Sequence, residues 1–351
     1  MKHFSLLLLW GIGSVFLVLS SCQSSKDQSQ NKMTQTAPQD IYPTAGGIIR
    51  LDAELDNLLS TEAKIEVLAE GFTWSEGPLW IPQGEYLLFS DVPKNTIHKW
   101  KESEGLSTFL TPSGYTGADT KEGETGSNGL VLDAQGRLVL CQHGDRRVAR
   151  LESSLDDATP DYATIADNYQ GQRFNSPNDA VFHPGGDLYF TDPPYGLLGQ
   201  DEDPDKELDF NGVYRVTAEG EVFLLTDEMT RPNGLAFSPD ARTLYVANSD
   251  PAMALWMAFD ILADGNVANG RVFFDATQWV EDKPGLPDGL KINDEGYIYA
   301  TGPGGVLIFN PQGKHLGTIN TGQKTSNCAF GENGKYLYMT ADMYLMRVKL
   351  K

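Results

Sequence analysis

The chain has 351 residues, and its 48 acidic side chains outnumber its 27 basic ones, which gives a net charge of −21. This charge argues against nucleic acid and anionic membrane surfaces as partners that bind through the bulk charge of the protein. The length allows two domains or one large all-β domain.

The N-terminus has the features of an export signal. Lys2 and His3 precede an apolar run from Phe4 to Leu19, and two serines then lead to Cys22. The run is shorter than the roughly 20 residues that a membrane-spanning helix needs. A basic start, a short apolar core and small residues before a cleavage point are typical of a signal peptide.

The sequence Leu-Ser-Ser-Cys resembles a bacterial lipobox, which implies removal of residues 1–21 and lipidation of the Cys22 sulfur. An ordinary signal peptide with an incidental cysteine is the alternative. We therefore expect an exported protein that its lipid holds in the bacterial cell envelope, in the periplasm or at the outer membrane. No other contact with a membrane is expected.

Residues 22–60 are predicted to be a tether, and residues 61–351 the folded domain. The stretch from 23 to about 45 is polar, rich in Ser and Gln, and lacks apolar periodicity, so it cannot bury enough surface to fold. Cys141 and Cys328 are far apart and each sits in an apolar run. They are expected to be buried free thiols, although one disulfide is compatible with export.

One pattern recurs six times along the domain. In each copy a short strand begins at a polar residue, a Gly or Asp turn follows, and a second short strand comes next. The copies begin at SEGPLW (75–80), SNGLVL (127–132), PNDAVF (177–182), PNGLAF (232–237), PDGLKI (287–292) and SNCAF (326–330). Further strand-like runs follow, such as 213–216 and 306–309, and no long amphipathic helix is evident.

Four short strands in a period of about 40 to 55 residues are typical of a propeller blade. Six copies therefore predict an all-β, six-bladed β-propeller with four-stranded blades. A strand over 64–69 precedes the first copy, and the chain stops after the run at 344–348. We expect the early strand to complete the last blade, because this covers an exposed edge and closes the ring.

The first strand of each blade lines the central channel of a propeller, so the repeated polar residue should point at the axis. These anchor residues are Glu76, Asn128, Asn178, Asn233, Asp288 and Asn327. Turn-forming residues are common wherever strands begin, but this does not explain one equivalent polar position in six copies. Clustered carboxylate and amide oxygens suit a hard cation. Histidine and cysteine are absent from the anchors, which argues against a zinc site of the usual type.

The same motifs resemble those of the senescence-marker-protein/gluconolactonase/luciferin-regenerating-enzyme family, from about residue 60 to the C-terminus. They are SEGP (75–78), NSPND (175–179), YFTDPPYG (189–196), RPNG (231–234) and PDG (287–289). The DPPYG run, together with QHGDRR at 142–147, is most similar to the bacterial gluconolactonase branch of that family.

The resemblance implies a divalent metal cofactor, preferably Ca²⁺, with Mg²⁺, Mn²⁺ or Zn²⁺ as alternatives. Carried over residue by residue, the ligands are Glu76, Asn178, Asn233 and Asp288. Two carboxylates neutralise a divalent ion, and amide oxygens orient it without excess charge. The implied reaction is metal-assisted hydrolysis of a sugar lactone such as gluconolactone, with Asp288 as the catalytic acid/base.

Four further residues are candidates for contact with the small lactone substrate. Asn128 could touch the substrate or only cap its strand. His143 could reach the channel mouth or form an ordinary loop hydrogen bond, and Tyr195 could roof the pocket or pack its own loop. Arg173 could hold a sugar acid. In the mammalian enzyme of the family that this sequence resembles, however, the substrate-binding arginine lies immediately upstream of the amide ligand, and that position aligns here with Ser176.

Two other functions are compatible with this sequence. The same metal site could hydrolyse other esters or organophosphates, because the ion does not select the acyl group. A propeller can also serve only as a binding module, since fold does not determine function. Two acids that converge with two amides favour an enzyme over a pure scaffold.

Overall fold

The computed structural model describes residues 41–351, so the predicted signal peptide, Cys22 and the first part of the tether lie outside it. From Tyr42 to Lys351 the chain forms one compact unit of six antiparallel sheets and one small hairpin. In this range the only helices are four short 3₁₀ turns, and none is long and apolar enough to cross a membrane. The predicted six-bladed β-propeller with four-stranded blades is confirmed.

The first three blades are formed by consecutive strands. Blade one contains β3 (Ser75–Ile81), β4 (Tyr86–Asp91), β5 (Thr96–Lys101) and β6 (Gly105–Leu110). Blade two contains β7 (Ser127–Leu132), β8 (Leu138–Gln142), β9 (Arg147–Leu151) and β10 (Tyr162–Ala166). Blade three contains β13 (Ala180–Phe182), β14 (Leu188–Asp192), β15 (Gly212–Val216) and β16 (Val222–Thr226), preceded by a hairpin of β11 (Asn168–Tyr169) and β12 (Gln172–Arg173).

The last two blades also take strands from the N-terminal part of the domain. Blade four contains β17 (Pro232–Phe237), β18 (Thr243–Asp250), β19 (Met253–Ile261) and β20 (Val267–Asp275). Blade five contains β21 (Leu290–Ile292), β22 (Ile298–Gly302), β23 (Gly305–Phe309), β24 (His315–Asn320) and, as a fifth strand, β1 (Gly47–Arg50). Blade six contains β25 (Thr325–Gly331), β26 (Tyr336–Ala341), β27 (Tyr344–Lys349) and β2 (Ile65–Glu70).

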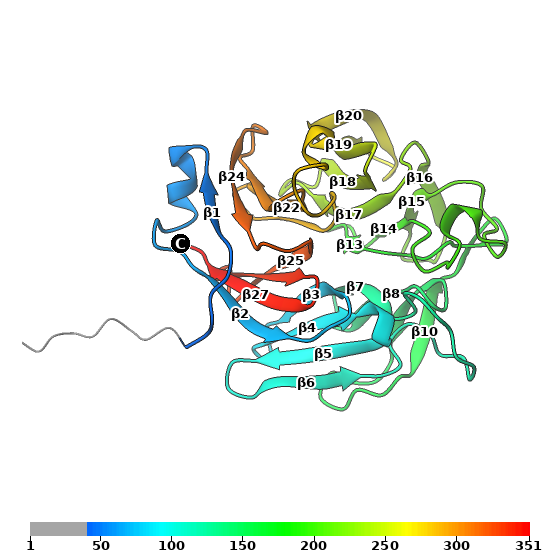
Figure 1. Ribbon diagram of the computed structural model, residues 1–351. Coiled ribbons are helices and arrows are strands. Elements are labelled where there is room, and N and C mark those ends of the chain that lie inside the picture. Colours follow the sequence, from blue (N-terminus) through cyan, green and yellow to red (C-terminus); the bar gives the residue numbers. More distant parts are fainter. Residues whose placement is uncertain (1–40) are drawn as a thin grey trace, which may run out of the picture. The chain divides into compact units, whose positions relative to one another are not determined.

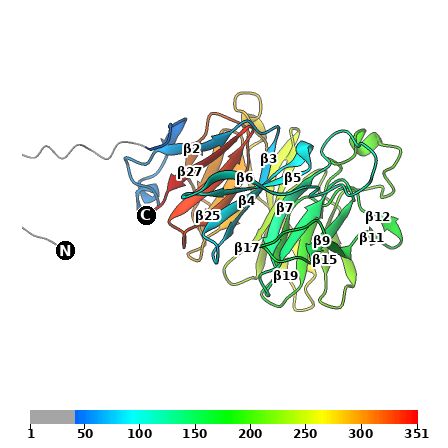
Figure 2. The same ribbon diagram turned by 90° about the horizontal axis from the view of Figure 1, so that it is seen from below.

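The first strands of neighbouring blades contact one another around the ring, from β3 through β7, β13, β17 and β21 to β25 and back to β3. They gather in the middle of Figure 1, while the last strands of the blades lie at the periphery. The polar start of each copy therefore lies at an inner strand, as the repeat predicts. The strand at Ile65–Glu70 pairs with β27 and completes blade six, which confirms the predicted closure (Figure 2).

The apolar core lies in the gaps between blades. Each of six buried clusters is shared by two neighbouring blades, for example Ile81 and Leu88 with Leu140 in the gap between blades one and two. Both faces of a blade are therefore buried, which explains the continuous apolar runs of the sequence. Each fully buried Leu or Phe contributes ~1.5–3 kcal/mol. Cys141 and Cys328 are buried and free in two different gaps, as expected.

The folded unit begins earlier than the predicted boundary at residue 60. Strand β1 pairs with β24, and the 3₁₀ turn η1 (Ala53–Asn57) follows it. Leu55 and Leu59 are fully buried in the gap between blades five and six. A few apolar residues thus dock on the edge strand of blade five, although the segment is too short to show apolar periodicity in the sequence. The docking covers the exposed edge of β24.

Candidate functional site

Polar residues from the starts of all six inner strands line one cavity of about 740 Å³. The cavity brings together five of the six anchors, and Thr325 represents the sixth strand. These residues are Glu76 (β3), Asn128 (β7), Asn178 (just before β13), Asn233 (β17), Asp288 (just before β21) and Thr325 (β25). The four residues expected to bind a metal therefore face the same space.

The glycine that follows an anchor lets the next inner strand approach closely. Gly77 has φ +52°, and a Cβ atom there would lie 2.0 Å from the Asn128 carbonyl oxygen. A Cβ atom on Gly234 would lie 2.4 Å from the Asp288 carbonyl oxygen. Only glycine fits such contacts without a shift of the backbone. The repeated acid-Gly and Asn-Gly pairs therefore have two roles: they begin the inner strands, and they allow the anchor side chains to come close together.

Glu76 is buried, with 2% of its surface exposed. Its Oε2 accepts hydrogen bonds from the Gly77 backbone N–H at 2.8 Å and from Asn327 Nδ2 at 3.4 Å. Burial, with a smaller contribution from the nearby Asp179, raises the pKa of Glu76 to about 8 against the lowering effect of those hydrogen bonds.

Asn327 does not line the cavity and instead supports Glu76. Its Nδ2 also lies 3.4 Å from Asp179 Oδ2, and its Oδ1 accepts from Lys291 Nζ at 3.3 Å. Lys291 Nζ is 3.9 Å from Asp179 Oδ2, so this lysine offsets part of the acidic charge next to Glu76. The sixth anchor therefore positions a carboxylate from outside the cavity lining.

Asp288 is partly exposed to the cavity, while its Oδ1 atom is buried and has no hydrogen-bond partner among the described residues. Burial raises the pKa of Asp288 well above its ordinary value, and Glu76, Asp179 and Glu124 add to the rise. A side-chain hydrogen bond with Asn233 acts in the opposite direction. No ion pair in the described part of the chain involves Glu76 or Asp288, so neither carboxyl group has a cationic side chain as its partner.

The donor set fits a hard divalent cation. Asn128 Oδ1, Asn178 Oδ1 and Asp288 Oδ1 are buried and have no partner within the described residues. Buried polar oxygens are normally satisfied, so three such atoms around one cavity indicate a missing partner. No three His, Cys, Asp or Glu side chains between residues 41 and 351 lie close enough to hold a metal ion. A cation here would therefore need the amide oxygens, which Ca²⁺ accepts readily.

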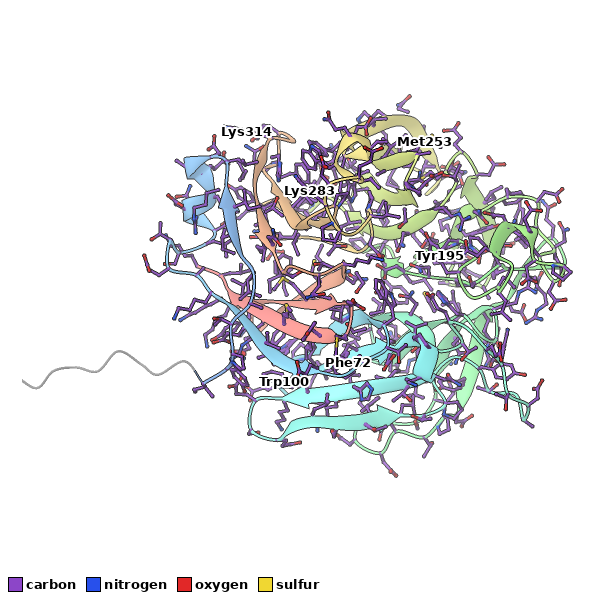
Figure 3. All side chains as sticks on the ribbon, viewed as in Figure 1. Phe72, Trp100, Tyr195, Met253, Lys283 and Lys314 are labelled. Atoms are coloured by element: carbon purple, nitrogen blue, oxygen red, sulfur yellow. The ribbon has the colours of Figure 1, made fainter. Side chains whose placement is uncertain are left out.

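Tyr195 lines the cavity from the loop between β14 and β15, whereas Lys283 reaches it from the loop between blades four and five (Figure 3). The side chain of Tyr195 hydrogen-bonds with Ser249, and burial raises its pKa. The Arg231 guanidinium lies 5.8 Å from the centre of the Tyr195 ring and pairs with Asp201 at 2.6 Å. Tyr195 is thus held between two neighbours at the wall of the cavity.

His143 does not reach the cavity mouth as expected. It is fully buried at the end of β8, behind Gly196, where an added Cβ atom would lie 2.8 Å from the His143 Cβ. Its Nδ1 is 3.5 Å from Glu124 Oε2, outside hydrogen-bond geometry, and Glu124 lines the cavity. His143 itself does not line the cavity, and its link to a lining residue is Glu124.

Arg173 is also absent from this cavity. It belongs to the β11–β12 hairpin, and its Nη2 donates to the Asp145 carbonyl at 2.9 Å. Its side chain lines a second, smaller cavity together with Lys121 and Arg146. The expected role of Arg173 in substrate binding is therefore not supported, because the hairpin directs it away from the anchors.

Several lining residues lie away from the starts of the inner strands, at the end of β18 and on the connections between strands: Trp74, Glu124, Gln200, Asp250, Lys283 and Lys324. Arg231 also lines the cavity, and it is the first residue of the RPNG motif at 231–234, so its position next to an anchor was evident from the sequence. The other loop positions have no periodicity, and sequence reasoning could not assign them to the cavity.

The fold and the cavity together define a six-bladed β-propeller whose inner strands present acids and amides to one candidate site. Residues 74–342 match the model of the SMP-30/Gluconolactonase/LRE-like region. The chain belongs to this family.

Individual relatives agree with this assignment. A gluconolactonase of Zymomonas mobilis is 40% identical over 315 residues, which cover 88% of this chain and 87% of the relative. The solved structure of a gluconolactonase from Xanthomonas campestris is 31% identical, has a TM-score of 0.74, and the match covers 88% of this chain and 97% of that one. Regucalcin of Oryctolagus cuniculus is 25% identical over 275 residues, 76% of this chain and 83% of the relative. These similarities support a lactone hydrolase.

Proposed function

We propose that this protein is a divalent-metal-dependent lactonase that hydrolyses a sugar lactone of the gluconolactone type in the cavity lined by the anchors. The observation that carries the proposal is the group of three buried oxygens without partners, on Asn128, Asn178 and Asp288, beside the buried carboxylate of Glu76. The similarity to gluconolactonases supports the choice of a lactone as substrate.

The four proposed metal ligands are Glu76, Asn178, Asn233 and Asp288, and the preferred ion is Ca²⁺ because all the donors are oxygens. When bound, the ion would supply Lewis-acid polarisation of the lactone carbonyl. The two carboxylates would balance its charge. Asn128 Oδ1 would be left to accept a hydrogen bond from a substrate hydroxyl or to join the ligands.

Asp288 is the proposed general base. Its carboxylate would accept a proton from the attacking water as the water oxygen forms a bond to the carbonyl carbon. The bond from that carbon to the ring oxygen then breaks, and the proton passes from Asp288 to the ring oxygen, which becomes the hydroxyl of the open-chain acid. Water and lactone together account for every atom of the product.

Tyr195 and Arg231 are proposed to contact the sugar ring. Tyr195 offers a ring face and a hydroxyl at the cavity wall, and both are held by neighbours. Rigid aromatic and cationic groups of this kind orient a polar ring at small entropic cost. Arg231 remains partly exposed, with 22% of its side chain accessible, so it can still donate to the substrate.

The test is a set of initial rates for the purified protein with several small lactones, a simple aryl ester and an organophosphate. We expect hydrolysis of the sugar lactone to be the fastest reaction and to depend on added divalent metal. If an ester or organophosphate were the best substrate, the proposal of a lactone substrate would be wrong, but the proposed metal site would not be contradicted. No turnover of any substrate in the presence of Ca²⁺, Mg²⁺, Mn²⁺ or Zn²⁺ would favour a binding module.

A further inference from the structure

A second cavity, of about 390 Å³, lies on another part of the propeller domain and shares no lining residue with the first. Three cationic side chains line it: Lys121, Arg146 and Arg173. They come from the long loop before β7, the turn between β8 and β9, and the β11–β12 hairpin. Residues 196–198 and 203–205 of the loop after β14, with Glu207, form the remaining wall.

None of these three cations makes an ion pair within the described part of the chain. Each donates instead to a backbone carbonyl: Lys121 Nζ to Gly144 at 2.9 Å, Arg146 Nη1 to Asp205 at 2.8 Å, and Arg173 Nη2 to Asp145 at 2.9 Å. In a protein with a net charge of −21, cations normally find carboxylates nearby. Three that converge on one cavity and remain unpaired indicate a place for a negative charge.

Arg146 is the most constrained of the three. Only 3% of its surface is exposed, and its Nε donates to the Phe174 carbonyl at 2.6 Å. Its Nη2 atom is buried and has no partner among the described residues. A buried guanidinium N–H without an acceptor is costly. Within this cavity, an external acceptor would remove that cost.

The mutual effects of the cations agree with this picture. Burial lowers the pKa of Lys121, and Arg146 and Arg173 lower it further, while Asp145 and Asp205 act in the opposite direction. Burial also lowers the pKa of Arg146, and Arg173 adds to the effect, against Glu207, Asp192 and Asp205. An anion bound between the three cations would reduce their mutual repulsion directly.

Carboxylates at the same wall do not fill the role of that anion. Asp203, Asp205 and Glu207 line the cavity, but none forms an ion pair with the three cations in the described residues. Asp203 accepts from the backbone N–H groups of Gly199 and Asp205 at 2.8 and 2.9 Å, and Glu207 accepts from the backbone N–H of Arg173 at 2.8 Å. The carboxylates of Asp203 and Glu207 therefore stabilise the backbone of the loop and the hairpin.

We propose that Lys121, Arg146 and Arg173 form a binding site for a small oxyanion, best matched by a phosphoryl group. Two guanidinium groups and one ammonium group offer several donors in different directions, which suits a tetrahedral anion with more than one negative charge. The site is separate from the proposed lactonase cavity. Its occupancy can be measured without substrate turnover, so the proposal stands independently of the proposed function.

The test is calorimetric titration of the purified protein with inorganic phosphate, with sodium chloride at equal ionic strength as the reference. We expect saturable phosphate binding. Lys121→Gln and Arg173→Gln should each weaken it at least about tenfold, the equivalent of one charge-assisted hydrogen bond of ~1.4 kcal/mol. Both side chains are on the cavity wall outside the apolar clusters, so these variants should fold, and Arg146→Gln is read only if its Tm is preserved.

Arg242→Gln is the matched control, because Arg242 is an exposed arginine with no ion pair in the described residues and lies at the turn between β17 and β18. It removes the same charge and should leave phosphate affinity within about twofold of the wild-type value. The proposal is overturned if phosphate produces no more heat than chloride. An unchanged affinity in both Lys121→Gln and Arg173→Gln would also overturn it, and acetate that binds as tightly as phosphate would reject the phosphoryl class.

Discussion

Asp288 has features that suit both a metal ligand and a proton acceptor. Its carboxyl group interacts electrostatically with Glu76 and has no ion pair among the described residues, and its Oδ1 has no hydrogen-bond donor there. The first feature suits a metal ligand, and the second leaves an oxygen able to accept a proton. Substitutions can separate the two roles.

Asp288→Asn should abolish lactone hydrolysis even at saturating metal. The amide keeps an oxygen for the ion but cannot act as a base, and loss of a general base typically lowers the rate 10²- to 10⁴-fold. Loss of one negative charge should also weaken metal binding, so the rate is compared at metal concentrations that saturate each variant. Asn128→Ala and His143→Ala should only weaken hydrolysis. Near-normal turnover of Asp288→Asn at saturating metal would show that Asp288 is a ligand alone.

The buried acids also predict a pH dependence of stability in the metal-free protein. The pKa of Glu76 rises from 4.5 to about 8 on folding, so the folded state holds a proton that the unfolded state has lost between these values. This contribution to the free energy of unfolding is full below the lower pKa and disappears as pH rises through the upper one. With chelator present, Tm should therefore fall as pH rises from 4.5 to about 8.

Divalent metal should reverse this trend, because the ion binds the deprotonated carboxylates. The gain in Tm on addition of Ca²⁺ is expected to be larger at pH 8 than at pH 5, and Glu76→Gln should remove most of the difference. An equal gain at both pH values would contradict the assignment of Glu76 as a ligand.

The sequence predicted which residues at strand starts lie together at the cavity, but it did not predict which loop residues join them. Glu76, Asn128, Asn178, Asn233 and Asp288 occupy equivalent positions of a repeat, and the symmetry of a propeller directs equivalent positions to one place. His143 and Arg173 lie on a turn and a hairpin, whose directions depend on neighbouring loops. No periodic signal in the sequence carries that information.

The inner strands form a ring because small residues at their starts permit close backbone contact. Gly77 combines φ +52° with a contact to Asn128, whereas Gly136, at the turn between β7 and β8, has φ +76° and open space around it. Comparison of these two glycines separates the cost of a left-handed backbone from the cost of a clash between blades.

Gly136→Ala should reduce the free energy of unfolding by ~1–2 kcal/mol, the usual cost of a left-handed conformation for an L-residue. Gly77→Ala should reduce it by at least ~3 kcal/mol, because its Cβ atom must also displace the neighbouring strand. Urea denaturation of both variants is the measurement. Equal losses would mean that the contact between blades one and two relaxes without cost.

The two N-terminal edge strands differ in how well the sequence predicts them. The closing strand of blade six was predictable, because it stands alone before the first copy and the last copy needs a partner. Strand β1 could not be predicted, because it has only four residues and directly follows a polar segment without apolar periodicity. Docking on β24 is a tertiary event that depends on an edge formed about 270 residues later in the chain.

The sixfold repeat in the sequence was sufficient to predict the architecture of the whole molecule. Apolar runs alternating with turns at a regular period can be stacked in a closed ring, and each gap between blades then contains its own core. The N-terminal segment is a separate matter, since Cys22 lies outside the described residues. We propose that it is the lipidated residue of an exported, envelope-anchored protein.

Cys22→Ala should therefore release a soluble protein or leave an unprocessed precursor, whereas the wild-type protein should fractionate with membranes. Fractionation of expressing bacterial cells, with immunodetection of both forms, is the measurement. Cys141→Ala is the matched control, because that thiol is buried in the propeller core. Identical membrane fractionation of wild type and Cys22→Ala would refute lipidation.

We propose that lactone hydrolysis requires a divalent metal held by the anchors. The most direct measurement is the rate of gluconolactone hydrolysis by the purified protein after treatment with chelator, followed by titration with Ca²⁺. We expect loss of activity on chelation, recovery that saturates with one bound ion per chain, and no recovery in Glu76→Gln at the same Ca²⁺ concentration. Undiminished hydrolysis in a protein shown by elemental analysis to be free of metal would contradict it.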